Sequence, residues 1–425
     1  MTCNIITLGC SKNVVDSEVI AAQLEKQGHR VVYESGEKSD IVIINTCGFI
    51  GDAREESVNE ILLQVDRKRR HQVKRIYVVG CLVKRFKPDL LESVPEVDGY
   101  YDFGELAELL REDSFQLLQT SERLLSTPRH YAYLKISEGC DRQCSYCSIP
   151  LIRGKQVSKP IPLLVEEMQK LADQGVREVM LIAQDLTYYG IDLTGKRELA
   201  SLMESLAQVR GIEWIRLHYA YPLNFPLEVL DVMTAFPQYC RYMDIPIQHI
   251  SDDILRSMRR GGSSEYISQL IDTFRERVPG IALRTTLITG YPGETHEQHK
   301  ELVAFIQRAR FERLGAFTYS QEEGTPAFEL GDPVKRSVKT KRYNEIMKLQ
   351  EEISLAFNKE KVGTTMKVMV DAEEEDYYVG RTEFDSPDVD NLVFINKDRK
   401  LPVGEFCHVE ITEAAPYDLF GTVIA

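Results

Sequence analysis

Apolar runs of strand length alternate with amphipathic stretches along the first hundred residues of the chain. Residues 4–8 form one such run, and residues 17–27 carry apolar side chains at helical spacing before Gly28. Further strands are predicted at 31–33, 40–45 and 75–79, with a helix at 53–70. Alternating strands and helices indicate an open parallel α/β sheet with helices on both faces.

Larger repeating units follow in the middle of the chain. Six strand-like runs are separated by helical stretches such as 163–174 and 264–277. The runs lie at 131–137, 178–183, 214–219, 242–247, 281–288 and 313–319. Six β/α units predict a partial (β/α)6 barrel, in which chemistry gathers at the C-terminal ends of the strands.

The segment from Gly363 onward has a different pattern. Its short predicted strands are separated by turns and lie at 365–370, 377–381, 392–395, 405–411 and 419–423. This pattern indicates a small antiparallel β-barrel, which a predicted helix at 340–360 connects to the larger barrel. Because 425 residues exceed one ordinary core, we expect an α/β multidomain protein. The predicted domains are 1–125, 126–360 and 361–425.

The composition is typical of a globular protein. Hydrophobic residues make up 43% of the chain and charged residues 28%. The sequence shows no signal-like start and no apolar run near the ~20 residues of a membrane-spanning helix. We therefore expect a cytoplasmic protein without membrane contact. Its net charge of −14 is unfavourable for gripping nucleic acid over a broad surface.

Three of the nine cysteines stand close together after the first strand of the predicted barrel. Cys140, Cys144 and Cys147 are spaced by four and then three residues. Three thiolates in one loop can bind three irons of a four-iron cluster and leave the fourth iron open to a small molecule. The alternative is zinc, but a tetrahedral zinc knot needs two ligand pairs, and no second Cys-x-x-Cys or His-x-His pair follows. The spacing therefore favours a reactive iron–sulfur cluster.

Three more cysteines occupy equivalent places in the first domain. Cys10, Cys47 and Cys81 each follow a predicted strand and have a neighbouring glycine. The carboxyl ends of parallel strands share one edge of a sheet, so these residues can meet in space. Their placement favours a second cluster, and the alternative is three buried structural cysteines. The remaining cysteines, interpreted as packing residues, are Cys3, Cys240 and Cys407.

The Cys-x-x-x-Cys-x-aromatic-Cys form, with Tyr146 in the aromatic position, resembles the radical S-adenosylmethionine (SAM) superfamily. The resemblance implies that SAM binds the open iron and that the reduced cluster cleaves it to a 5′-deoxyadenosyl radical. The residues that we expect to contact this cofactor are Tyr146, Gln184, Asp185, Arg284 and Gly290. For Arg284, a structural ion pair is an equally good interpretation. His218 and His249 receive no catalytic role.

With both triads, the whole chain resembles the methylthiotransferase family of radical SAM enzymes. The matching stretches include Leu8-Gly9-Cys10, Asn45-Thr46-Cys47, Glu138-Gly139-Cys140, Asp244-Ile245-Pro246-Ile247-Gln248-His249 and Gly290-Tyr291-Pro292-Gly293-Glu294-Thr295. The resemblance implies a C-terminal TRAM barrel and two 4Fe–4S clusters. The cluster of the N-terminal triad would carry the sulfur or methylthio group that is transferred.

Members of this family modify either a transfer-RNA adenosine or an aspartate of a small-subunit ribosomal protein. From Gly363 onward the chain carries five basic and fourteen acidic residues, a net charge of −9. The acidic run at 371–376 is by itself typical of a solvated loop, but an acidic domain attracts a basic ribosomal protein and disfavours extended nucleic-acid binding. The stretches 8–13 and 183–185 also resemble the ribosomal-protein branch.

The sequence therefore predicts methylthiolation of an aspartate β-carbon in a small-subunit ribosomal protein, free or on the ribosome. By the resemblance, one SAM donates the methyl group and a second SAM supplies the radical. An electron donor such as a flavodoxin would be a further partner. The alternatives are a transfer-RNA adenosine methylthiotransferase and, more distantly, a non-catalytic metal-bound module that binds ribosomes.

Overall fold

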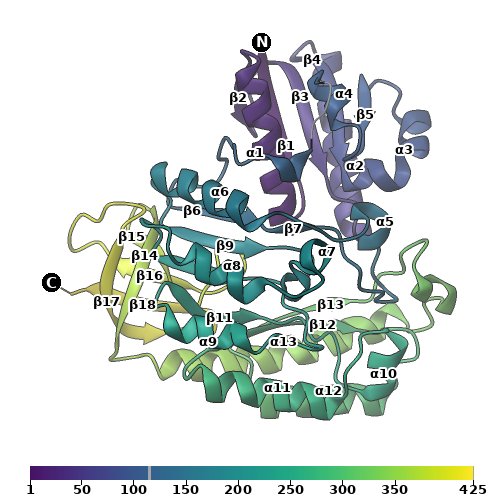
Figure 1. Cartoon of the computed structure of the whole chain (residues 1–425). Coiled ribbons are helices and arrows are strands. Elements are labelled where there is room, and N and C mark those ends of the chain that lie inside the picture. The colour runs from purple at the N-terminus through teal and green to yellow at the C-terminus, as the bar shows by residue number, and fades with distance from the viewer. Residues whose placement is uncertain (113–115, 425) are drawn as a thin grey trace.

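The computed structural model describes residues 1–112 and 116–424. In Figure 1 the N-terminal domain (purple) and the C-terminal barrel (yellow) lie against different sides of the central domain. The predicted α/β multidomain architecture is confirmed. Within the described ranges, no helix combines the length and the apolar character needed to cross a bilayer.

The first domain is a parallel sheet with the strand order β2-β1-β3-β4-β5. Its elements are β1 (Thr2–Thr7), α1 (Ser11–Lys26), β2 (Arg30–Tyr33), β3 (Ser39–Thr46), α2 (Gly51–Arg69), β4 (Val73–Gly80), α3 (Cys81–Ser93), β5 (Gly99–Tyr101) and α4 (Leu106–Leu110), followed by the 3-10 turn η1 (Leu117–Gln119). The predicted strands are confirmed, but α1 begins well before its predicted start at residue 17. Lys12, Asn13 and Asp16 are polar yet buried. The amphipathic pattern therefore fails to mark the first turns of this helix.

Helices cover both faces of this sheet. Alternate residues of a strand point to opposite sides, so Val42 and Ile44 join a core with α2 and α3, while Ile41 and Ile43 join a core with α1. Because β1, β3 and β4 run parallel, their carboxyl ends share one edge of the sheet. This edge faces the central domain.

The central domain is a parallel six-stranded sheet in chain order, with β6 and β13 at its edges. Its strands are β6 (Tyr131–Lys135), β9 (Glu178–Ile182), β10 (Trp214–Leu217), β11 (Tyr239–Asp244), β12 (Ala282–Thr289) and β13 (Arg313–Thr318), with a short pair β7 (Ser137–Glu138) and β8 (Val157–Ser158). Its helices are α5 (Ile149–Arg153), α6 (Ile161–Asp173), α7 (Ile191–Thr194), α8 (Leu199–Leu206), α9 (Glu228–Ala235), α10 (Asp252–Ser257), α11 (Ser264–Arg277), α12 (His296–Ala309) and α13 (Arg336–Lys359), with 3-10 turns η2 (Leu186–Tyr188) and η3 (Pro326–Leu330). The predicted partial barrel is confirmed.

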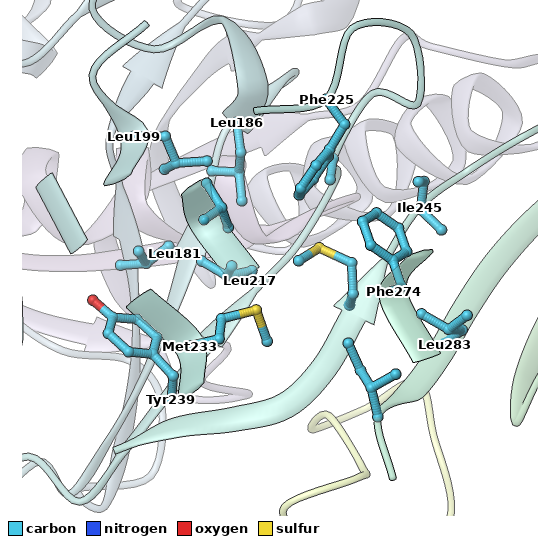
Figure 2. Close-up of a cluster of buried hydrophobic side chains, with 14 of the residues drawn as sticks. Leu181, Leu186, Leu199, Leu217, Phe225, Met233, Tyr239, Ile245, Phe274 and Leu283 are labelled. Carbon is cyan, nitrogen blue, oxygen red and sulfur yellow. The ribbon is translucent and has the colours of Figure 1, made fainter. Parts of the chain in front are cut away.

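The main core lies between the outer face of this sheet and its helices. Figure 2 shows strand residues such as Leu181, Leu217 and Leu283 packed against helix residues such as Met233 and Phe274. β11 starts at Tyr239, ahead of the predicted residue 242, because Tyr239 and Cys240 are buried in the sheet.

The inner face of the central sheet is covered by the other two domains. Tyr133 and Ile182 pack against Val15 and Val19 of α1. On the neighbouring strands, Trp214 and Tyr242 pack against residues of the C-terminal barrel. Both flanking domains therefore close the open side of the partial barrel.

The C-terminal domain is a closed five-stranded barrel with the order β14-β15-β16-β18-β17. Its strands are β14 (Thr365–Glu373), β15 (Tyr377–Thr382), β16 (Leu392–Asn396), β17 (Phe406–Ala414) and β18 (Asp418–Val423). The small barrel is confirmed, although one of its pairs, β16 with β18, runs parallel. The domain boundaries at 125/126 and 360/361 stay predictions.

Candidate active site

The first cysteine triad lies in the loop that follows β7. The amide of Cys147 donates to the carbonyl of Cys144 (3.1 Å), and the amide of Cys140 donates to Gly154 (3.1 Å). Gly139 has a φ of +76°, and a Cβ there would overlap the carbonyl of Lys155. Burial raises the pKa of the Cys140 and Cys147 thiols to about 12 each, and the neighbouring thiol of Cys144 adds to both shifts. Metal binding at this loop would therefore release protons.

Arg260 lies beside this triad, and sequence reasoning did not identify it. Its guanidinium donates to the sulfur of Cys144 (3.5 Å) and to the hydroxyl of Tyr146 (3.2 Å). It also stacks on the ring of Tyr221, 4.4 Å from the centroid. A buried guanidinium therefore lies within hydrogen-bond distance of a predicted cluster ligand.

The second triad gathers at the edge shared by β1, β3 and β4. Cys10 precedes α1, Cys47 follows β3 and Cys81 begins α3. Burial raises the pKa of Cys47 to about 12, and the nearby thiols of Cys81 and Cys10 contribute to the shift. A Cβ at Gly9 would lie 3.0 Å from the sulfur of Cys47. The fold thus brings together three residues that are far apart in the sequence.

The donor chemistry of both triads fits an iron–sulfur cluster. Each offers three thiols, and soft thiolates are the usual ligands of such clusters. Over residues 1–112 and 116–424, no group of three or more His, Cys, Asp or Glu side chains is arranged to hold a single metal ion. A four-iron cluster is different because each thiolate binds its own iron, so its ligands stand apart.

Arg153 connects the second triad to the segment just before the first triad. Its guanidinium donates to the sulfur of Cys81 (3.4 Å), to Asn13 Oδ1 (2.6 Å) and to Asp16 Oδ2 (2.7 Å) in the first domain. In the central domain it donates to Glu138 Oε2 (3.0 Å), two residues before Cys140. Burial raises the pKa of Glu138, but Arg153 and a neighbouring lysine outweigh this effect and lower it to about 2. The interface between the triads is therefore a buried, ionised network.

The five predicted SAM contacts lie in different surroundings. Tyr146 contacts Arg260, and Gln184 donates to Glu138 Oε1 (2.7 Å). The carbonyl oxygen of Gln184 is buried and has no hydrogen-bond partner within the described part of the chain. It is a suitable acceptor for a polar ligand. Asp185 accepts from Arg142 (2.8 Å) and caps the turn η2 through the amide of Thr187 (2.9 Å).

The other two predicted contacts have structural partners. Arg284 pairs with Asp244 (3.1 Å) and with Asp390 of the C-terminal domain (3.4 Å). Gly290 has a φ of +73°, and a Cβ there would overlap the side chain of Lys339. The role of all five residues in binding SAM stays a prediction.

His218 and His249 both have structural partners. His218 lies 2.9 Å from the hydroxyl of Ser386 in the C-terminal domain. Burial and the nearby cations, foremost Arg284, lower its pKa well below the usual range. His249 accepts from the amide of Ser251 (3.0 Å).

A cavity of about 650 Å³ opens where the three domains meet. Cys10 lies on its wall from the first domain, His218 and Arg284 from the central domain, and Asp388 and Val389 from the C-terminal domain. This volume lies within the range of roughly 300–1,000 Å³ of ligand sites. The cavity therefore opens onto Cys10 of the second triad.

Known protein families match all three parts of the chain. Residues 2–102 match the uncharacterized protein family UPF0004, residues 134–306 the radical SAM superfamily and residues 362–424 the TRAM domain. Among solved structures, the radical SAM methyltransferase TsrM from Kitasatospora setae is similar, with a TM-score of 0.59 and 17% identity over 77% of this chain and 73% of TsrM. The cobalamin-dependent enzyme OxsB gives a TM-score of 0.51 and 13% identity over 82% of this chain and 56% of OxsB. These two structures bear on the fold alone.

Relatives named "Ribosomal protein uS12 methylthiotransferase RimO" match nearly the full length. The protein of Christiangramia forsetii is 53% identical over 98% of this chain and 93% of the relative. The protein of Flavobacterium johnsoniae is also 53% identical, over 98% of this chain and 97% of the relative. The Bacteroides thetaiotaomicron protein is 49% identical over 99% of this chain and 98% of the relative. With this identity along its whole length and a radical SAM domain at its centre, the chain belongs to the RimO family of radical SAM methylthiotransferases.

Proposed function

We propose that this protein methylthiolates the β-carbon of an aspartate in ribosomal protein uS12, with SAM as both methyl donor and radical source. The observation that carries the proposal is that Arg153, on the helix after the first triad, donates to Cys81 of the second triad and to Glu138, two residues before Cys140. A radical step and a sulfur-transfer step then have neighbouring sites. The names of the full-length relatives support this choice of reaction.

The radical SAM domain implies SAM and a 4Fe–4S cluster, and we place that cluster on Cys140, Cys144 and Cys147. When bound and reduced, it supplies the electron that cleaves SAM. Arg260 would help to position Cys144 as a cluster ligand. The unpartnered oxygen of Gln184 would accept a hydrogen bond from the amino group of SAM.

We place a second 4Fe–4S cluster on Cys10, Cys47 and Cys81, where it would carry the sulfur or methylthio group that is transferred. Arg153 would fix the position of Cys81 relative to the central domain; burial raises the pKa of the Cys81 thiol, and the guanidinium opposes this shift. Asn13 supports the same arrangement, because its amide nitrogen donates to the carbonyls of Leu8 (2.7 Å) and Thr46 (3.1 Å), each two residues or fewer from a ligand.

The C-terminal barrel would attract the substrate protein. Its net charge of −9 suits a basic partner and repels phosphate. Tyr377, Phe394 and Phe420 form an aromatic stripe across three strands, with ring centroids 5.0 and 5.4 Å apart. Aromatic faces bind arginine and lysine side chains, so an acidic barrel with exposed rings fits a basic ribosomal protein. This substrate would place the enzyme in the cytoplasm, where a flavodoxin is a suitable electron donor.

The proposal is tested by offering the reconstituted enzyme uS12 and unmodified transfer RNA side by side under anaerobic conditions with SAM. We expect a methylthio mass increment on the uS12 aspartate and none on adenosine. A modified adenosine with an unmodified aspartate would assign the chain to the transfer-RNA reaction. Absence of SAM cleavage from the fully reconstituted protein would instead indicate a non-catalytic module.

A further inference from the structure

The C-terminal barrel sends one loop into the open side of the central domain. This β15–β16 loop comprises residues 383–391 and joins two neighbouring strands of the barrel. Its base is buried, with Asp385 and Ser386 at most 1% exposed, whereas Asp388 and Val389 at its tip are exposed. The loop therefore has an anchored base and an accessible tip.

Arginines on the inner face of the central sheet hold the base of the loop. Arg313 donates to Asp385 (2.9 Å), and Arg216 donates to the carbonyl of Glu383 (2.6 Å). Arg284 lies 3.4 Å from Asp390. These three arginines come from three strands of the sheet, so the loop is fixed across most of its width.

Uncharged side chains add to the same attachment. Tyr242 donates to Asp390 (2.7 Å), and the hydroxyl of Ser386 lies 2.9 Å from His218. Buried hydrogen bonds of this kind fix geometry because a change of position leaves a buried polar group without a partner. The position of the loop tip is thus set by the central domain and not only by the barrel.

The tip forms one wall of the cavity that contains Cys10. Pro387, Asp388 and Val389 line it from the C-terminal domain, and Cys10 lines it from the first domain. Asp388 also accepts a hydrogen bond from Tyr133 of the central sheet (3.3 Å). A molecule that reaches Cys10 through this cavity therefore passes the tip of the loop.

We propose that the β15–β16 loop is part of the substrate site, where its tip selects the peptide segment that carries the target aspartate. The inference rests on the proposed function, because it takes the cavity as the route to the second triad. The cavity suits such a segment, because Asp388 and Glu34 on its wall attract the basic residues of a ribosomal protein. The C-terminal domain would then recruit the substrate protein and also determine which of its peptide segments reaches the reacting centre.

A pair of matched variants tests this role. Val389→Trp enlarges the loop tip inside the cavity, whereas Val403→Trp enlarges an equally exposed valine of the same domain that does not line it (53% and 48% exposed). Each variant is assayed for uS12 methylthiolation and for SAM cleavage without substrate, and the first rate is normalised to the second. We expect kcat/KM for uS12 to fall about ten-fold or more in Val389→Trp and to stay at the wild-type value in Val403→Trp.

Hydrogen exchange of the wild-type holoenzyme provides a second measurement. Added uS12 should slow backbone exchange in peptides that cover residues 386–390, and peptides that cover Val403 should not change. Equal kcat/KM in the two variants, or unchanged exchange at 386–390 during active turnover, would overturn the inference while the proposed function stands. If wild-type enzyme leaves uS12 unmodified, the proposed function fails and the inference falls with it.

Discussion

The guanidinium of Arg153 lies 3.4 Å from the sulfur of Cys81, although the two residues belong to different domains and are 72 positions apart. Arg153 ends the short helix that follows the first cysteine triad, and Cys81 belongs to the second triad. The other hydrogen bonds of the Arg153 guanidinium go to Asn13, Asp16 and Glu138. One buried cation therefore contacts a sulfur of the second triad and carboxylates from both domains.

Removal of the Arg153 guanidinium should lower the free energy of unfolding. Arg153→Ala leaves Asp16 and Glu138 buried with fewer partners, and breaking a buried ion pair in this way costs ~3–5 kcal/mol. We expect a loss of that size in the free energy of unfolding, measured with urea. Arg256→Ala, which breaks a surface pair whose side chains are 75% and 73% exposed, should cost no more than ~1 kcal/mol. Similar losses for both variants would show that the Arg153 network contributes little.

The first triad should control the radical step. Anaerobic reconstitution should give about eight irons per chain if both triads hold four-iron clusters. Replacing Cys140, Cys144 and Cys147 with alanine should halve the iron content and abolish formation of 5′-deoxyadenosine. A matched control replaces the packing cysteines Cys240 and Cys407 and should keep all the iron. Unchanged iron in the triad variant would refute the assignment.

The second triad should control only the transfer of sulfur. Replacing Cys10, Cys47 and Cys81 with alanine should also halve the iron content, but 5′-deoxyadenosine should still form. Methylthiolation of uS12 should disappear, because the variant lacks the proposed sulfur-carrying cluster. If the variant still modifies uS12, these cysteines are structural.

The sequence was sufficient for local features and insufficient for contacts between domains. Apolar runs located most strands, since burial of a strand depends on its own residues, and the spacing of Cys140, Cys144 and Cys147 is itself local. The meeting of Cys10, Cys47 and Cys81 followed from the general geometry of parallel sheets. Arg153 and Arg260 were not predicted as site residues, because their sulfur contacts span 72 and 116 positions. The β15–β16 loop was missed for the same reason, since its acidic residues resemble a solvated turn until the opposing arginines are in place.

Stability should depend on pH through Glu294. Burial raises the pKa of its carboxyl, but His249, His299 and Arg342 outweigh this effect and lower it from 4.5 to about 2. Because the folded pKa is lowered, the stabilisation is complete above pH 4.5 and is lost as pH falls toward 2. This shift corresponds to about 3 kcal/mol.

The comparison with Glu294→Gln isolates this contribution. In urea unfolding of the metal-free protein, the variant should be less stable than wild type at neutral pH, and the difference should shrink between pH 4.5 and about 2. Glu297→Gln, at an exposed position of the following helix, should change the free energy of unfolding by less than ~0.5 kcal/mol at every pH. A difference between Glu294→Gln and wild type that does not vary with pH would contradict the ion-pair explanation.

The turn between β14 and β15 offers a direct test of recruitment by charge. An ion pair joins Glu373 to Lys397 (2.9 Å), whereas Glu374, Glu375 and Asp376 make none within the described part of the chain. Replacing these three residues with lysine should raise the KM for uS12 roughly ten-fold or more, because the field that attracts a basic protein is reversed. SAM cleavage without substrate provides the internal reference.

The control for this reversal makes the same change in charge elsewhere. Glu301, Glu351 and Glu352 are exposed on α12 and α13, and their replacement with lysine should leave the KM for uS12 close to that of wild type. Raising the salt concentration should increase the wild-type KM and reduce the difference between wild type and the turn variant, because exposed charges are screened over ~8 Å at physiological ionic strength. If both triple variants raise KM equally, net charge alone matters. If neither does, the acidic turn has no part in recruitment, and selection would depend on contacts inside the cavity.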